Sequence, residues 1–135
     1  NTISATFGIS QMKHVNDFIQ SRRKVCQEYN QAFYDIPGIK IPQTDFANIS
    51  PFIYSLRILD GKRHDLIEHL QKLAIGAGIH FIPVHKHEYF KFDKKSDMTV
   101  TEKVSDEVLT LPLHSNMKSE FVTRVINGVT SFFNK

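Results

Sequence analysis

Residues 52–74, FIYSLRILDGKRHDLIEHLQKLA, change from the pattern of a strand to the pattern of a helix across a single turn. Up to Ile58, apolar residues alternate with Ser55 and Arg57, which is the period-two pattern of a strand with a buried face. The pair Asp60-Gly61 predicts the turn that closes this strand. From 63 to 73 the apolar residues recur at intervals of three and four, as on the buried stripe of a helix. The stretch therefore predicts one strand and one helix of an α+β fold.

The N-terminal quarter of the chain has the pattern of a helix. From 2 to 34 apolar residues recur at intervals of three and four, which predicts one long amphipathic helix and leaves open a break within it. Pro37-Gly38 ends this helix. Residues 39–50 predict an irregular connection, because they combine a proline with Thr, Asp and Asn.

Shorter elements follow the helix predicted at 63–73. Gly76 and Gly78 predict its end, and 79–84 predicts a short strand. Residues 92–98 predict a charged loop. Residues 108–113 predict a brief strand at a sheet edge or strand end, because a proline interrupts them.

Two signals predict helix starts in the last third of the chain. Thr99 and Glu102 have the spacing of a capping box, which predicts a short helix through Asp106. Asn116 predicts the cap of a final helix. That helix has a wide apolar stripe, made of Phe121, Val122, Val125, Ile126, Val129, Phe132 and Phe133.

The order of these elements predicts an α+β fold with a small sheet, antiparallel or mixed, that helices cover mostly on one face. At 135 residues the chain has the size of one domain. We expect residues 1–35 to form a long connecting helix and residues 51–135 to form a body of sheet and helices. Because the chain begins at Asn1 with the helical pattern already under way, we expect it to be part of a longer protein.

Charge, hydropathy and cysteine content narrow the classes of protein. The net charge is +3 and basic residues are interspersed with acidic ones, so the basic stripe typical of nucleic-acid binding is missing. No apolar run reaches the roughly 20 residues of a membrane span. The single cysteine, Cys26, excludes an internal disulfide and fits a reducing compartment, so a cytoplasmic location is expected. Its place on the apolar stripe of the first helix predicts an inert buried thiol.

Three of the seven histidines lie in residues 74–90, AIGAGIHFIPVHKHEYF. His80, His85 and His87 raise the alternative of a small metal-binding domain, since imidazoles at alternate strand positions can converge on one ion. The spacing weakens this alternative, because His80 would face away from the other two on a regular strand. No P-loop or dinucleotide-binding motif is present. A non-catalytic interaction domain is a second alternative.

Two motifs stand in a fixed order in the second half of the chain. They are IGAGIHFIPVH at 75–85 and L-x-LP-x-H-x-x-M at 109–117. Scattered positions accompany them: Ser4-Ala5, Phe7-Gly8-Ile9, Gln11, Phe18-Ile19, Arg22, Tyr29, Arg63, Leu66 and Leu70. Together they resemble the C-terminal part of the DegT/StrS-type sugar aminotransferases, which use pyridoxal phosphate to move an amino group, usually from glutamate, to a keto sugar carried on a nucleotide. The resemblance implies the C-terminal small domain of aspartate-aminotransferase-type (fold type I) enzymes.

The resemblance also implies that the chain is one part of such an enzyme. The family's catalytic lysine and its pyridoxal-phosphate site belong to a large N-terminal domain, which is absent from this chain, and no lysine here sits in the family's lysine motif. We therefore expect no catalytic, cofactor-binding or metal-binding residue in the chain, and no activity of the chain alone. The full-length enzyme is expected to bind pyridoxal phosphate and to form a homodimer.

By the same resemblance, three residues contact the nucleotide sugar. His80 and Phe81 stand at the family's His-Tyr pair, and His85 stands at its later histidine. An imidazole can donate a hydrogen bond to a sugar hydroxyl or, when protonated, offset phosphate charge. Phe81 lacks the hydroxyl of the usual tyrosine. Ala74 replaces a usual glycine, and we expect the glycines at 76 and 78 to absorb the change in backbone conformation.

Overall fold

The computed structural model describes residues 1–90 and 97–134 of the chain. Its helices are α1 (Thr2–Met12), α2 (Val15–Phe33), α3 (Arg63–Lys72), α4 (Thr99–Glu107) and α5 (Ser119–Phe133). Its strands are β1 (Ile39–Lys40), β2 (Tyr54–Ile58) and β3 (Val108–Leu111), and the short 3-10 helices η1 (Val84–Lys86) and η2 (Glu88–Phe90) lie between α3 and α4. Within the described residues, no helix combines the length and the apolar character that crossing a membrane requires.

The sheet is antiparallel, and β2 is its central strand in the order β1-β2-β3. Tyr54 pairs with Leu111 of β3, and Ile58 pairs with Ile39 of β1. Along β2, fully buried side chains alternate with half-buried ones, which confirms the predicted strand with one buried face. β1 occupies the first two residues of the segment 39–50, which the sequence predicts to be irregular throughout.

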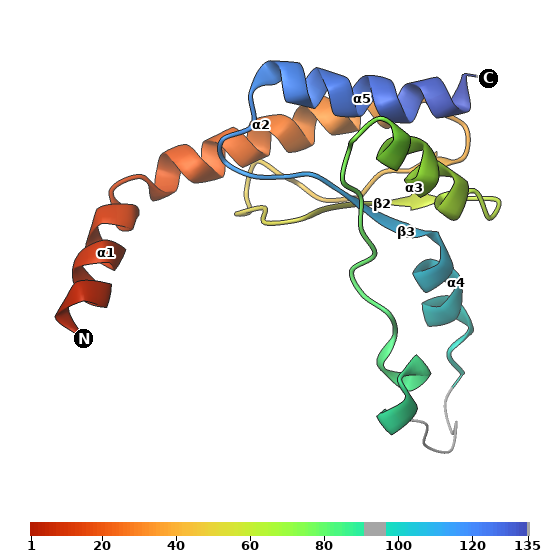
Figure 1. Cartoon of the computed structure of the whole chain (residues 1–135), viewed down its shortest axis with the longest axis horizontal. Coiled ribbons are helices and arrows are strands. Elements are labelled where there is room, and N and C mark those ends of the chain that lie inside the picture. The colour runs from red at the N-terminus through yellow and green to blue at the C-terminus, as the bar shows by residue number, and fades with distance from the viewer. Residues whose placement is uncertain (91–96, 135) are drawn as a thin grey trace.

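The core lies between one face of the sheet and the helices α2, α3 and α5 (Figure 1). At its centre the rings of Tyr29 and Tyr54 are 5.0 Å apart between centroids. Both hydroxyls donate hydrogen bonds, from Tyr54 to Asn30 Oδ1 at 2.9 Å and from Tyr29 to the carbonyl of Pro112 at 3.0 Å. The fully buried aliphatic members of the core are Leu56, Ile58, Leu66, Leu70, Leu109, Leu111 and Val129. The predicted α+β fold, with helices on one face of a small sheet, is confirmed.

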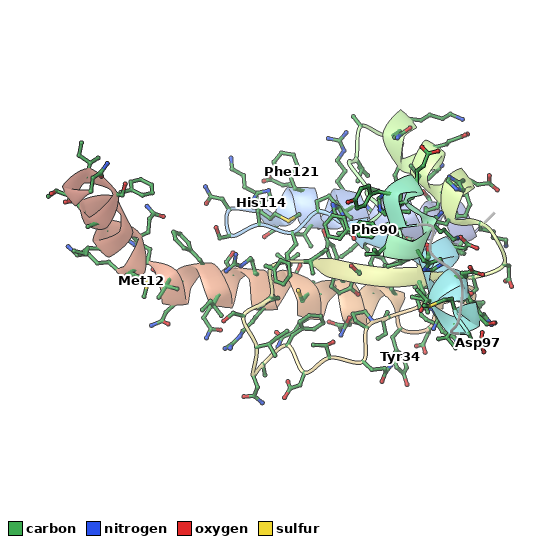
Figure 2. All side chains as sticks on the ribbon, turned by 90° about the horizontal axis from the view of Figure 1, so that it is seen from below. Met12, Tyr34, Phe90, Asp97, His114 and Phe121 are labelled. Carbon is green, nitrogen blue, oxygen red and sulfur yellow. The ribbon has the colours of Figure 1, made fainter. Side chains whose placement is uncertain are left out.

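The helix predicted over residues 1–35 is divided into α1 and α2. The break falls at Lys13 and His14, where the His14 amide bonds to the carbonyl of Gln11 at 3.0 Å in a tighter turn. α1 has no buried residue and points away from the body, and Met12 lies at the bend (Figures 1 and 2). Its apolar side chains, such as those of Ile3 and Phe7, are therefore exposed in this chain.

The strand predicted at 79–84 is wrong. Within the described residues 74–90, Gly78 alone pairs with the sheet, through two backbone hydrogen bonds to Thr110 of 3.0 and 2.8 Å. Beyond it, residues 79–90, here called the arm, leave the sheet and extend away from the body together with α4 (Figure 1). Pro83 has no amide hydrogen for a sheet partner, and Phe81, like Ile82, is exposed. Apolar residues in this segment therefore mark a projecting surface rather than a buried strand.

α4 is present where the sequence predicts a helix, but the predicted capping box is wrong. Thr99 is the first helical residue and follows Met98 at the cap position, which makes no side-chain cap bond. Asp97 Oδ1 instead accepts hydrogen bonds from the Thr99 amide at 2.9 Å and from the Thr99 hydroxyl at 2.5 Å. Glu102 Oε1 lies 3.2 Å from Nε2 of His85 in η1. Of the charged loop predicted at 92–98, residues 92–96 lie outside the described residues.

The prediction of a final helix is confirmed by α5, but the predicted position of its cap is wrong. Lys118, not Asn116, occupies the cap position, and the Asn116 amide donates to Nδ1 of His114 at 3.2 Å. The predicted apolar stripe faces the core, with the exception of Phe121, which is exposed. Its buried members are Val122, Val125 and Val129.

The end of α3 is formed by Ala74 rather than by Gly76 or Gly78. Ala74 has a φ of 53°, in the left-handed region, whereas neither of those glycines has a positive φ. The Ile75 amide bonds to the carbonyl of Leu70, and the Ala74 amide bonds to that of Gln71, both at 2.9 Å. These two bonds make a Schellman motif, in which glycine is the usual left-handed residue. The expectation that Gly76 and Gly78 absorb the change is therefore wrong.

We expect Ala74→Gly to stabilise the chain. A left-handed residue with a side chain costs about 1–2 kcal/mol, while the added freedom of glycine in the unfolded chain costs about 0.4–1 kcal/mol. The free energy of unfolding, measured by urea denaturation, should rise by roughly 0.5–1 kcal/mol. Gly76→Ala is the matched control, because no atom lies within 4 Å of the added Cβ, and it should not lose stability. An unchanged or lower stability of Ala74→Gly would contradict the assignment.

Candidate functional site

The face of the sheet away from α2 and α5 carries polar side chains. Ser55 and Thr110 oppose each other in register, with their hydroxyl oxygens 3.1 Å apart. Two residues along β2, Arg57 forms an ion pair with Glu107 at the end of α4, with 2.5 Å between Nη2 and Oε2. Nε of Arg57 donates to the same oxygen at 2.7 Å. This face therefore combines hydroxyl groups with a charged contact that ties α4 to the sheet.

A hollow of about 340 Å³ lies where the arm leaves this region. Two of its aromatic walls are exposed to solvent, Phe52 to 79% and Phe81 to 78%. His80 is exposed in the same wall as Phe81, and their rings are 5.0 Å apart between centroids, nearly perpendicular. The remaining lining residues are Ile53, Thr110, Leu111 and Leu113. The hollow can hold a ligand that has both an apolar surface and hydrogen-bonding groups.

Helix α4 connects the arm to the body. Besides the pair between Arg57 and Glu107, the guanidinium of Arg63 in α3 donates to the carbonyl of Ser105. On the other side of α4, two contacts reach η1 of the arm. Nε2 of His85 lies 3.2 Å from Oε1 of Glu102, and Nζ of Lys86 lies 3.5 Å from Oδ1 of Asp106. The position of the arm thus depends on side chains of α4.

The structure brings two of the three predicted substrate-contact residues together. His80 and Phe81 line the hollow, whereas His85 is not part of its lining and is directed toward Glu102. The sequence does not predict two neighbours of these residues: Phe52, which lines the hollow with His80 and Phe81, and Glu102, which contacts His85. The strand pattern includes Phe52 without showing that its ring is exposed. The contact of Glu102 joins residues far apart in the sequence, which no local pattern predicts.

The histidines of the arm do not gather into a metal site. Within residues 1–90 and 97–134, no three His, Cys, Asp or Glu side chains lie close enough to hold an ion. His80 lines the hollow, His85 contacts Glu102, and His87 is exposed.

The fold is that of one part of the aminotransferases. The crystal structure of the aminotransferase TlmJ from Streptoalloteichus hindustanus matches 97% of the chain with a TM-score of 0.88 at 23% sequence identity, and 36% of that protein is covered. PseC of Helicobacter pylori, an aminotransferase of pseudoaminic acid biosynthesis, matches 94% of the chain with a TM-score of 0.82 at 21% identity, and again 36% of the protein is covered.

Sequence similarity shows the family. The model of the DegT/DnrJ/EryC1/StrS aminotransferase family matches residues 1–130, so the chain belongs to this family. The spore coat polysaccharide biosynthesis protein SpsC of Bacillus subtilis is 30% identical over 136 residues, which cover 94% of the chain and 35% of SpsC. The dTDP-4-amino-4,6-dideoxy-D-glucose transaminase of Shigella dysenteriae is 26% identical over 133 residues, with 94% and 36% covered. The chain spans about a third of the length of these relatives.

Aminotransferases of this family depend on pyridoxal phosphate, and the residues of this chain do not fit that cofactor on their own. The lysine that binds pyridoxal phosphate has to be an activated amine, which burial or a neighbouring cation provides. Every lysine that the structure describes is exposed at the surface.

Cys26 takes no part in the candidate site. It is fully buried on the core side of α2, which confirms the predicted buried thiol. Burial raises the pKa of the thiol to about 11, and the nearby Arg22 opposes this only in part. The thiolate is the nucleophilic form, so the folded chain suppresses the reactivity of Cys26.

Folded protein should therefore protect Cys26 from thiol reagents. At pH 8 the thiolate fraction should be about 0.1%, far below that of an exposed cysteine. We expect negligible reaction with Ellman's reagent until urea unfolds the chain, and then one thiol per chain. Because the pKa is raised by folding, the unfolded chain loses this proton first, and stability should decline as pH rises from about 8.5 toward 11. Rapid labelling of the folded chain at pH 8 would contradict the burial.

Proposed function

We propose that this chain is the C-terminal small domain of a pyridoxal-phosphate-dependent aminotransferase that acts on a nucleotide-linked keto sugar, with glutamate as the amino donor. Membership of the aminotransferase family supports the reaction class. The name of the Shigella dysenteriae relative, a transaminase of a dTDP-linked amino sugar, supports the substrate class. The cytoplasmic location inferred from the single cysteine stays a prediction.

The observation that carries the proposal is the hollow beside the open face of the sheet. It places His80 and Phe81, the pair that resembles the family's His-Tyr pair, next to the exposed ring of Phe52. A sugar has apolar C–H faces that pack on aromatic rings and hydroxyls that bond to imidazole. His80 and Phe81 would bind and orient the nucleotide sugar, and His85 would contribute from the adjacent turn of the arm.

The pyridoxal-phosphate site and the residues that perform amino transfer would lie in a part of the protein outside this chain. Pyridoxal phosphate, when bound there, supplies the electron sink for amino transfer. Residues 1–35 would connect that part to residues 51–135, and the exposed apolar side chains of α1 suit such a contact. The full-length protein would be a homodimer, and the chain alone would be inactive. The upstream coding sequence tests this directly: it has to encode a pyridoxal-phosphate domain with its lysine, and a different upstream region would contradict the proposal.

In the full-length enzyme, His80→Ala and His85→Ala should weaken turnover of the nucleotide sugar without releasing the cofactor. Loss of one hydrogen bond of about 0.5–1.5 kcal/mol lowers kcat/KM roughly 2- to 12-fold. The assay is 2-oxoglutarate formation from L-glutamate with dTDP- and UDP-linked 4-keto sugars, and the absorbance of bound pyridoxal phosphate should stay unchanged. His64→Ala on α3 is the control, because His64 is exposed outside the hollow. Loss of the cofactor absorbance would instead assign His80 or His85 to the cofactor or the fold.

The isolated chain should not retain pyridoxal phosphate. After incubation with the cofactor and dialysis, we expect no absorbance above 330 nm that co-purifies with the 135-residue chain. The physical reason is that its described lysines are exposed and compete poorly for a stable covalent link. A stoichiometric bound chromophore would overturn the assignment of the cofactor to the rest of the protein.

A further inference from the structure

Arg22 occupies a position on the buried stripe of α2. Cys26, Tyr29 and Phe33 follow it on the same face of the helix, at spacings of three and four residues, and all three are fully buried. Arg22 itself is half-buried. A charged side chain therefore stands where the pattern of the helix favours an apolar one.

The guanidinium of Arg22 has no acceptor in the part of the chain that the structure describes. Its Nε is buried without a hydrogen-bond partner, and no described carboxylate forms an ion pair with it. The other arginines of the chain each donate to an oxygen atom: Arg23, Arg57, Arg63 and Arg124. A buried donor without a partner is costly, and native structures contain few of them.

The nitrogens of Arg22 differ in their access to solvent. Nε is enclosed by this chain, whereas Nη1 and Nη2 also lack a described partner but are not among the buried atoms. These two nitrogens therefore reach the surface. Two N–H groups of a guanidinium can bind both oxygens of one carboxylate through parallel hydrogen bonds. The charged end of Arg22 is thus open to a partner that approaches from outside the chain.

Arg22 lies at the border between the folded body and the projecting helix α1. The hydroxyl of the preceding residue, Ser21, donates to the carbonyl of Ser115 at 2.7 Å, so the segment before α5 contacts α2 at this point. On its N-terminal side α2 extends beyond the sheet and leads into α1 (Figure 1). There the exposed apolar side chains of Ile3 and Phe7 belong to the surface that, under the proposed function, contacts the rest of the protein.

We propose that Nη1 and Nη2 of Arg22 bind the carboxylate of an Asp or Glu side chain in the part of the protein outside this chain. The inference rests on the proposed function, which requires such a part, and it adds a specific charged contact to the apolar one. The ion pair would join α2 to that part where the core of this chain ends. Two parallel hydrogen bonds would also fix the direction of approach, which apolar side chains do not.

The place of Arg22 within its helix favours a carboxylate over a phosphate. Phosphate sites usually collect several donors, among them free backbone amides at the start of a helix. Arg22 lies inside α2, where the backbone amides bond to carbonyls of the same helix. The neighbouring Arg23 donates its Nε to the carbonyl of Ile49. A single guanidinium edge matches the two oxygens of a carboxylate.

Hydrogen exchange of the α2 amides tests the contact. Arg22→Met removes the charge and supplies a long apolar side chain that suits the buried stripe. In the full-length protein it should speed exchange of these amides about 12- to 160-fold, the range for loss of a hydrogen bond to a charged group. In the 135-residue chain, where Arg22 has no partner, exchange should stay the same or become slower. Faster exchange in both proteins, or in neither, would overturn the proposal.

Arg23→Met is the matched control. Both partners of its hydrogen bond, Nε of Arg23 and the carbonyl of Ile49, lie within this chain at 2.7 Å. The substitution should therefore change exchange equally in the 135-residue chain and in the full-length protein. Arg22→Lys, which keeps the charge, should recover part of the protection that Arg22→Met removes. An effect as large as that of Arg22→Met would overturn the ion pair.

Ligand dependence separates a carboxylate partner from a phosphate. Protection of the α2 amides in the parent full-length protein should be the same with and without dTDP, and with and without pyridoxal phosphate. Protection that arises only when either ligand is added would assign Arg22 to a phosphate group and overturn the proposal. Aminotransferase turnover is measured separately. Its absence would contradict the proposed function, whereas the exchange of α2 decides the role of Arg22.

Discussion

The packing of Tyr54 against Tyr29 joins the sheet to the longest helix, and the other layers are arranged around it. Both side chains are fully buried, and stacked contacts with Phe33 and Phe46 extend the cluster on either side. Each buried aromatic ring removes about 150–250 Å² of surface from water, so four of them dominate a core of this size. The two phenol groups have partners in the carbonyl of Pro112 and the side chain of Asn30, without which their burial would be costly.

The central strand directs its side chains to the two faces of the sheet. Its alternate residues 54, 56 and 58 face this core, whereas Ser55 and Arg57 face the open side of the sheet. Arg57 connects the sheet to α4, because it forms an ion pair with Glu107. Glu102, also on α4, contacts His85 of the arm. Two side-chain contacts, of Arg57 with Glu107 and of Glu102 with His85, therefore connect the central strand to the arm through α4.

Periodicity predicts the helices and strands that pack against the core. It fails where contacts with distant parts of the chain determine the local conformation. The apolar stripes of α3 and α5 and the alternation along β2 arise because each element buries one face. These patterns can therefore be predicted from the sequence. Asn116 does not cap α5, because capping depends on the direction from which the chain enters the helix. Residues 79–84 have strand-like composition but only one backbone pair with the sheet next to them. Family resemblance predicts roles for His80 and Phe81, which stay predictions, whereas the contact of Glu102 with His85 joins distant segments and is visible only in the structure.

The arm and α4 begin and end at nearly the same place on the sheet. The chain leaves the sheet at Gly78, which pairs with Thr110, and re-enters β3 at Val108. Such an excursion closes on itself, so the number of residues it contains has little effect on the register of β2 and β3. A change in the number of residues between Gly78 and Val108 is therefore compatible with an unchanged core. Evolution can therefore alter the reach and chemistry of the arm at small cost to folding.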